Sequence, residues 1–264
     1  MAGVWKIFAI VSLLVAMNGY SSSPNTVRLM SFNVRMGCGH DDPFELAKGS
    51  LGHLPQCADV IRGVGPDIVG IQEIDRLTDR SGGMDQAAEL ARLCGLEGTF
   101  VKKVDRPGGD YGLAELSKTK PLKVGSVLMK GSLHPRALMI CDYGDYVVAN
   151  THFPLAEWAC TNAAAVVRRS LRNWTVRKPV FLMGDFNSTP DSVTMRSIKE
   201  DFVVLTDESV LTWSVKNPAR TIDYILVDKA HAANVRMLDR RIVRAPEATD
   251  HVALVIDVKM TNTK

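Results

Sequence analysis

The sequence has few cysteines, little excess charge of either sign, and no apolar run long enough to cross a membrane as a helix. Its five cysteines are odd in number and form no C-x-x-C pair, so neither a zinc ribbon nor a disulfide scaffold is indicated. The formal net charge of +3 is too small for a chain that coats polyanions or anionic membranes by bulk electrostatics. Any phosphate that the protein handles must therefore be held by a local site.

The composition is that of a globular protein. Of the 264 residues, 46% are hydrophobic and 23% are charged, which excludes a disordered chain and a collagen-like repeat. From residue 27 onward the sequence contains no linker, low-complexity stretch or internal repeat. We therefore predict one domain over residues 27–260.

The first residues have the pattern of an export signal. A single lysine, Lys6, precedes an apolar run over residues 7–17 that only Ser12 interrupts, and small and polar residues follow at 18–24. This run is shorter than the roughly 20 residues that a membrane-spanning helix needs. We predict a signal peptide over residues 1–23 and an exported protein, either secreted, periplasmic or extracellular. The alternatives are an uncleaved segment that tethers the protein to a membrane and a buried N-terminal strand.

Hydrophobic periodicity predicts a chain in which strands outnumber helices. Alternation and short apolar runs between Gly, Pro and Asp turns predict strands at residues 27–34, 67–73, 99–103, 112–117, 123–128, 136–141, 146–152, 180–185, 221–227 and 252–258. Apolar residues at helical spacing predict helices at residues 56–64, 84–94 and 155–174.

Polar residues stand at or near the ends of many of these predicted strands. They are Asn33, Glu73, His152, Asp185 with Asn187, Asp223, and the adjacent Asp250 and His251. Glu73 is expected to share a strand face with the apolar Val69 and Ile71. Because strand ends on one rim of a sheet lie close together, these polar residues are candidates for a single site.

Four acids on one rim would repel one another. Each close pair among Glu73, Asp185, Asp223 and Asp250 would cost roughly 4 kcal/mol at an effective dielectric constant of about 20. Either the acids are not neighbours or a cation lies among them. Oxygen ligands without clustered thiolates favour Mg²⁺, with Mn²⁺ or Ca²⁺ as alternatives.

His251 is the candidate base. A histidine with a pKa near ~6.5 accepts a proton at neutral pH when a carboxylate fixes its tautomer, and Asp223 is the strand acid available to do this. Asp185 and Asn187 lie two residues apart where the chain leaves a strand, so both can turn toward one phosphate. Considered alone, each of these residues also has a structural explanation, as a turn or capping residue, an ordinary histidine or a paired acid.

Five short motifs occur in an order and spacing that resemble one family. They are SFNV at residues 31–34, PDIVGIQE at 66–73, GDFN at 184–187 with Pro190 beyond it, TIDYI at 221–225 and TDH at 249–251. From residue 27 to residue 258 the chain is similar to the endonuclease/exonuclease/phosphatase superfamily. Tyr111, His152, Thr212 and Trp213 are also similar to family positions.

The resemblance implies a four-layer α/β sandwich, with two mixed sheets face to face, helices outside, and metal-assisted attack of water on a phosphate ester at one rim. Residues at the matching positions that are expected to hold the metal are Glu73, Asn33 and Asp250. Residues expected to be catalytic are His251, Asp223, Asp185, Asn187 and His152. Among these, His251 resembles the histidine that activates water or stabilises the pentacovalent phosphorane, oriented by Asp223.

The sequence therefore predicts a secreted, Mg²⁺-dependent phosphoric ester hydrolase, more specifically a phosphodiesterase. Its substrate is expected to be a phospholipid head group, a sugar phosphate or a nucleic acid, and the protein is expected to be a monomer without a stable protein partner. The alternatives are a nuclease acting on DNA or RNA and a non-catalytic module that binds a phosphate ligand. Three tryptophans are expected to pack in the interior rather than to stack on bases: Trp158, Trp174 and Trp213.

Overall fold

Two mixed sheets of six strands each form the centre of the protein. The structure, a computed structural model, describes residues 25–40, 51–129 and 135–261, and the predicted signal peptide of residues 1–23 lies outside these ranges. The first sheet has the strand order β11 (Val235–Val243), β12 (Ala253–Met260), β1 (Thr26–Asn33), β2 (Ile68–Arg76), β4 (Gly109–Ser117) and β3 (Glu97–Arg106). The second has the order β5 (Lys123–Met129), β6 (Arg136–Asp142), β7 (Val147–His152), β8 (Val180–Asp185), β10 (Asp223–Asp228) and β9 (Phe202–Val204).

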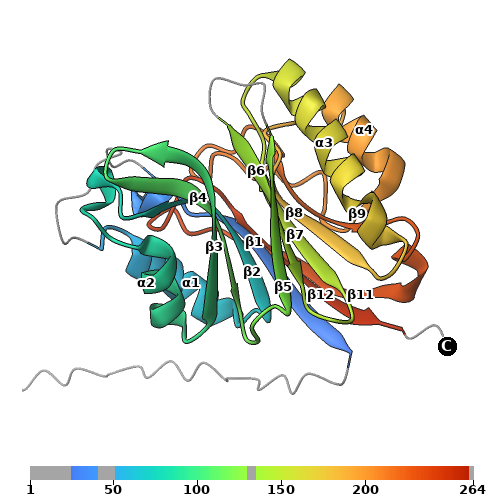
Figure 1. Ribbon diagram of the computed structural model, residues 1–264, viewed down its shortest axis with the longest axis horizontal. Coiled ribbons are helices and arrows are strands. Elements are labelled where there is room, and N and C mark those ends of the chain that lie inside the picture. Colours follow the sequence, from blue (N-terminus) through green and yellow to red (C-terminus); the bar gives the residue numbers. More distant parts are fainter. Residues whose placement is uncertain (1–24, 41–50, 130–134, 262–264) are drawn as a thin grey trace, which may run out of the picture.

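Helices cover the outer face of each sheet, which gives the predicted four-layer α/β sandwich (Figure 1). α1 (Leu54–Val64) and α2 (Gln86–Cys94) lie on the first sheet, and α3 (Glu157–Thr175) and α4 (Val193–Asp201) lie on the second. β1 pairs with β2 in parallel, and so does β7 with β8. Parallel neighbours need a crossover connection, which α1 and α3 provide. The carboxyl ends of these four strands consequently lie on the same rim.

Apolar side chains fill the space between the sheets and the space under the helices. Leu29, Ile225 and Ile256 are fully buried in the cluster between the sheets, while Ile61 and Leu171 are buried under α1 and α3. Burying one such side chain contributes about 1.5–3 kcal/mol. The central strands are buried on both faces, and this rigid core fixes the strand ends that carry the polar residues.

A polar contact joins the two sheets just below that rim. Asn150 on β7 is fully buried, and its Nδ2 donates hydrogen bonds of 3.0 Å to the backbone oxygens of Ile71 and Ala114 in the first sheet. Its Oδ1 accepts a 2.8 Å hydrogen bond from Gln72 Nε2 on β2. A Cβ at Gly70 would lie 3.0 Å from Asn150 Cγ, so glycine permits this close approach. The contact fixes β2 against β7.

The predicted helices are confirmed as α1, α2 and α3, with bounds that differ by at most two residues from those expected. The prediction missed α4, β9 and β11. α4 is short and begins after the capping side chain of Ser192, whose oxygen accepts from Met195 N. β11 is an edge strand whose exposed charged side chains hide its alternation. The expectation that Trp158 packs in the interior is wrong, because its side chain is 62% exposed on α3.

None of the helices in the described part of the chain is both long and apolar enough to span a membrane. All five cysteines fall within the described ranges and none of them is in a disulfide bond.

One buried acid between the sheets has a strongly shifted pKa. Glu115 on β4 is 1% exposed, and burial raises its pKa from 4.5 to about 8, although a hydrogen bond from the Tyr143 hydroxyl opposes this rise. That hydroxyl donates to Glu115 Oε1 over 2.6 Å. The folded protein therefore holds a proton on Glu115 that the unfolded chain releases near pH 4.5.

Replacing Glu115 by Gln should remove a pH dependence of stability. The stabilising contribution of the buried, protonated Glu115 is complete below the unfolded pKa and is lost as the pH rises through the folded value, by about 1.4 kcal/mol per unit of difference. Urea denaturation at several pH values should show that the free energy of unfolding of Glu115→Gln increases relative to that of the wild type as the pH rises from 4.5 to about 8. The matched control is Glu97→Gln at an exposed position of β3, which should show no such trend. A difference that stays constant with pH contradicts this assignment.

Candidate active site

Polar side chains from both sheets meet around one small cavity at the rim. The cavity has a volume of about 190 Å³. It is lined by Arg35, Glu73, Tyr111, Arg136, His152, Leu155, Asp185, Asn187, Trp213, Arg220, Ile222, Asp250 and His251. Six of the eight predicted site residues line this cavity, and the other two, Asn33 and Asp223, are bonded to its lining. The prediction that distant chain segments meet at one rim is therefore confirmed.

Glu73 reaches the cavity because β2 contains a bulge. Gln72 pairs with Leu113 and Ile74 with Gly112, which leaves Glu73 without a partner on β4 and with a φ of 56°. The expectation that Glu73 shares a face with Val69 and Ile71 is wrong, since Ile74 joins their core cluster instead. A bulge adds one residue, changes which face each side chain occupies, and is common beside functional sites.

Asn33 connects the acids of the two sheets. It is the last residue of β1 and is 1% exposed. Its Nδ2 donates to Glu73 Oε1 over 3.3 Å and to Asp185 Oδ2 over 3.1 Å, and it lies 3.4 Å from His251 Nε2. Its Oδ1 accepts from the Arg35 backbone nitrogen over 3.0 Å. In this geometry the amide nitrogen faces the acids, so its role as an oxygen ligand stays a prediction that requires rotation of the amide.

His251 and Asp223 form the buried pair that the sequence predicted. His251 Nδ1 lies 3.2 and 3.1 Å from the two carboxylate oxygens of Asp223, and both side chains are almost fully buried. Thr212 aligns them, because its hydroxyl oxygen accepts from the backbone nitrogens of Ile222 and Asp223 and its carbonyl accepts from Val252. Nε2 of His251 is left facing Asp185 Oδ2 at 3.8 Å.

Burial and neighbouring charges shift the pKa values of His251 and Asp185. Burial lowers the pKa of His251, but the carboxylate of Asp223, with Asp185 and Asp250, outweighs it and raises the value to about 10. Burial, with the carboxylate of Asp223, raises the pKa of Asp185 to about 7. The protein without a cation therefore carries a histidinium beside an acid that titrates near neutral pH.

His152 and Asn187 complete the wall around Asp185. His152 Nε2 lies 3.6 Å from Asp185 Oδ2 and 3.9 Å from Glu73 Oε1. Burial, followed by the charges of Lys103 and Arg136, lowers the pKa of His152 well below 6.5, so its imidazole is neutral at physiological pH. Asn187 has a φ of 47°, and its Nδ2 donates to the carbonyl of Phe153 over 3.0 Å.

Asp250 also lines the cavity, and the side chains of Trp213 and Arg35 contact its carboxylate. The Trp213 indole nitrogen donates to Asp250 Oδ2 over 3.2 Å, and Arg35 Nε lies 3.8 Å from the same oxygen. Trp213 was expected to be a packing residue, but it lines the cavity, and the Arg220 guanidinium lies 4.5 Å from its ring. This tryptophan therefore belongs to the site.

The donor set fits a divalent cation. Donor atoms of Glu73, His152 and Asp185 lie within 4.8 Å of one another, and so do those of Asp185, Asp223 and His251. Carboxylate oxygens dominate both sets, as a hard cation such as Mg²⁺ prefers. Glu73 and Asp185 are the acids placed to hold it, whereas the predicted role of Asp250 as a ligand stays a prediction.

Two basic residues beside the site were not predicted, Lys103 and Arg136. Arg136 is the first residue of β6 and lines the cavity. A polar residue at the end of an apolar strand is the same signal that identified Asn33 and His152, so Arg136 was accessible to sequence reasoning. Lys103 could not be predicted as a site residue, because it follows the solvent-facing Lys102 in a strand whose apolar and polar residues do not alternate regularly.

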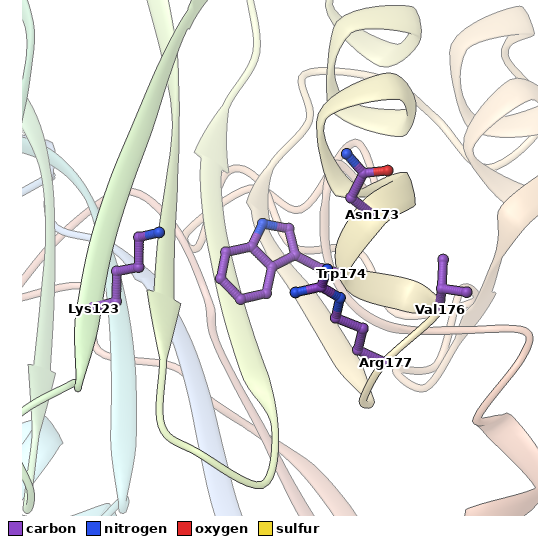
Figure 2. A pocket seen from close by; sticks show the side chains of 5 residues that line it. All are labelled: Lys123, Asn173, Trp174, Val176 and Arg177. Atoms are coloured by element: carbon purple, nitrogen blue, oxygen red, sulfur yellow. The ribbon is translucent and has the colours of Figure 1, made fainter.

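A larger cavity lies away from these residues. It has a volume of about 500 Å³ and is lined by Lys123 at the start of β5 and by Asn173, Trp174, Val176 and Arg177 at the end of α3. Figure 2 shows the Trp174 indole lying between β5 and the end of α3. Because its lining contains no carboxylate and no histidine, this cavity offers neither a ligand set for a cation nor a base.

A buried His–Asp pair and convergent acids at the rim of a four-layer α/β sandwich define a class of proteins, the metal-dependent phosphoesterases of this fold. The chain belongs to the Endonuclease/Exonuclease/phosphatase family, whose profile matches residues 30–251. No curated protein matches the chain by sequence.

Solved structures with low sequence identity have the same fold. An endonuclease/exonuclease/phosphatase from Beutenbergia cavernae is 20% identical with a TM-score of 0.72, over 90% of this chain and 72% of that chain. The mannosyl-6-phosphatase Bt3783 of Bacteroides thetaiotaomicron is 18% identical with a TM-score of 0.65, over 88% of this chain and 99% of that chain. Truncated TDP2 of Caenorhabditis elegans is 18% identical with a TM-score of 0.65, over 89% and 97%.

Replacing Asp223 by Asn should lower the pKa of His251 from its value near 10, because the carboxylate that stabilises the imidazolium is lost. NMR titration of the imidazole in metal-free protein measures the change. The stability that the raised pKa contributes is complete below about 6.5 and is lost as the pH rises toward 10, so it should shrink in the variant. Asp239→Asn at the exposed edge strand β11 is the control and should leave the titration of His251 unchanged. An unaltered His251 titration in Asp223→Asn would sink this account.

Proposed function

We propose that the protein hydrolyses small phosphate esters, phosphodiesters first, with a bound divalent cation that we expect to be Mg²⁺. The observation that carries this proposal is the His251 imidazole, which is held by Asp223 at one nitrogen and faces Asp185 and the cavity with the other. A base fixed in this way, next to neutral His152 and the amide of Asn187, is suited to deliver water to a phosphorus atom.

The residues of the chain divide the reaction between them. Asp185 orients the attacking water and His251 accepts its proton, while the water oxygen adds to phosphorus and the bond to the ester oxygen breaks. Asp223 fixes the tautomer of His251 and stabilises its charged form. His152 and the Asn187 amide donate hydrogen bonds to the phosphoryl oxygens, and the leaving oxygen takes up a proton from solvent water.

Glu73 and Asp185 would hold the cation, which would polarise a phosphoryl oxygen and lower the pKa values of neighbouring groups. This matters for His251, because a histidine with a pKa of about 10 holds its proton at neutral pH. A cation that offset the carboxylate of Asp185 would lower this pKa toward neutrality. Asp185 would therefore couple cation binding to the protonation state of His251.

Replacing His251 by Gln should lower kcat for bis-p-nitrophenyl phosphate by about 10²- to 10⁴-fold, the usual contribution of a general base. The substrate panel also includes nucleic acid, sphingomyelin, an inositol phosphate and a hexose 6-phosphate, each with Mg²⁺ and with EDTA. His231→Gln is the matched control, because His231 pairs with Asp228 over 2.8 Å outside the cavity. Full activity in His251→Gln would defeat the mechanism. Binding of Mg²⁺ without turnover of any substrate would favour the non-catalytic binding module instead.

Salt dependence separates a small-substrate enzyme from the nuclease alternative. A nuclease that contacts about six phosphates should lose roughly 10³-fold in affinity between about 50 and 200 mM salt. The small cavity and the net charge of +3 favour a weak dependence, which steady-state kinetics at increasing NaCl would measure. A steep loss of KM-limited activity on DNA or RNA would establish the nuclease instead.

We also propose that the protein is exported through residues 1–23. The proposal rests on the apolar run at residues 7–17 and the small residues that follow it. Mass spectrometry of the protein recovered outside the cytoplasm would locate its N-terminus, and an intact residue 1 would contradict cleavage.

A further inference from the structure

A second bulge directs a cation toward the active site. Lys102 on β3 pairs with Gly112 and Val104 pairs with Tyr111, which leaves Lys103 without a partner on β4. The bulge at Glu73 lies on the other side of β4, opposite Gly112 and Leu113. One strand is thus flanked by two bulges, and each presents a charged side chain, an acid on β2 and a cation on β3.

Lys103 is buried without a counter-ion. It is 2% exposed, and its ammonium has no hydrogen-bond partner among the described residues. It lies 3.9 Å from the centre of the Tyr111 ring, which lines the cavity. Burial, together with the charge of Arg136, lowers the pKa of Lys103, while Glu73 and Asp185 raise it, so all four groups act on one another. An unpaired buried ammonium is costly unless an anion is bound beside it.

Arg136 provides a second unsatisfied cation at the same place. It is 8% exposed and lines the cavity, and its Nε has no hydrogen-bond partner within the described part of the chain. By contrast, Arg80, which also lies over the Tyr111 ring, is fully paired through two bonds to Asp75. Arg106 also lies over this ring, at 5.7 Å, and its Nε has no partner among the described residues, but only Arg136 of the two arginines lines the cavity.

Strand order places both cations on one side of the reacting groups. In the first sheet, the order β1, β2, β4, β3 leads from Asn33 past Glu73 and Tyr111 to Lys103. In the second, β10, β8, β7, β6 leads from Asp223 past Asp185 and His152 to Arg136. With about 4.8 Å between neighbouring strands, Arg136 stands roughly 10 Å from the strand of Asp185. The strand order therefore places both cations beyond His152 from the His251–Asp223 pair.

We propose that Lys103 and Arg136 form an anion subsite that binds a second phosphate group of the substrate, beyond His152 from the phosphate that is hydrolysed. The subsite rests on the proposed function, because its anion belongs to the same substrate. The guanidinium offers paired donors to phosphate oxygens and the ammonium offers a compact charge. Lys103 and Arg136 are thus specificity-determining residues that select esters carrying an additional terminal phosphate.

Binding of inorganic phosphate tests the subsite without any turnover. Calorimetry in EDTA should show that the wild type binds inorganic phosphate and that Lys103→Met and Arg136→Met each weaken this binding by about tenfold or more, as expected for one charge-assisted contact. Lys102→Met is the matched control, because Lys102 is exposed and pairs with Asp105 and Asp110. Phosphate binding that survives both Lys103→Met and Arg136→Met but disappears in His251→Gln overturns the proposal. Should Lys103→Met fail to fold, Arg136→Met decides.

Kinetics distinguish a second phosphate from the phosphate that is hydrolysed. The pair of substrates is a phosphodiester with a terminal phosphate and the same compound without it. In Lys103→Met, KM should rise about tenfold for the first substrate alone, with kcat nearly unchanged. Equal losses for both substrates would assign Lys103 to the hydrolysed phosphate and overturn the second-phosphate subsite. If the wild type hydrolyses neither, the proposed function fails, and phosphate binding still decides whether the anion subsite exists.

Discussion

The contact between Asn150 and the first sheet is the constraint on which the site depends. Glu73 and Asn33 come from one sheet, whereas His152, Asp185 and Asp223 come from the other, so the site exists only while the sheets keep their relative position. Close packing of the apolar side chains between the sheets holds them together, and directional hydrogen bonds add to their registration. Asn150 has one arrangement that satisfies its three hydrogen bonds to Gln72, Ile71 and Ala114. Leaving these groups unpaired would cost about 1–3 kcal/mol each, which makes sliding unfavourable.

The acidic and the basic side chains lie in different parts of the site, so that one part suits a cation and the other suits an anionic ester. The acids Glu73 and Asp185 gather where a cation fits, and Asp223, with Asp185 and Asp250, raises the pKa of His251. The cations lie on the far side of His152, where they add to the effect of burial in lowering the pKa of its imidazole. A phosphate ester brings negative charge into the space between, and so relieves the unpaired cations while the metal offsets the acids. Substrate and metal are therefore expected to stabilise each other's binding.

The sequence alone predicted the site residues that lie at the ends of strands. Asn33, His152 and Asp185 end strands whose apolar pattern is plain, and the TDH and TIDYI motifs located the His251–Asp223 pair. Residues placed by a bulge could not be predicted in the same way. A bulge adds one residue to the period of two, so the face expected for Glu73 was wrong, and the strand predicted at residues 99–103 did not identify Lys103 as a site residue. The role of Asn150 was not predicted, because the pattern around a polar residue inside a strand does not indicate which groups it binds.

The positions of the two groups of residues explain how one fold can serve different phosphate esters. Asn33, Glu73, His152, Asp185 and Asp223 are carried by β1, β2, β7, β8 and β10, which are interior strands of their sheets, while His251 lies just before β12. β3 is an edge strand of the first sheet, and β6 has only the edge strand β5 beyond it. Side chains on such outer strands change at lower cost to the core, because fewer neighbours must adjust. Lys103 and Arg136 thus lie on strands toward the edges of the two sheets, whereas Asp185 lies on an interior strand, and solved structures of 17–20% identity have this same sandwich.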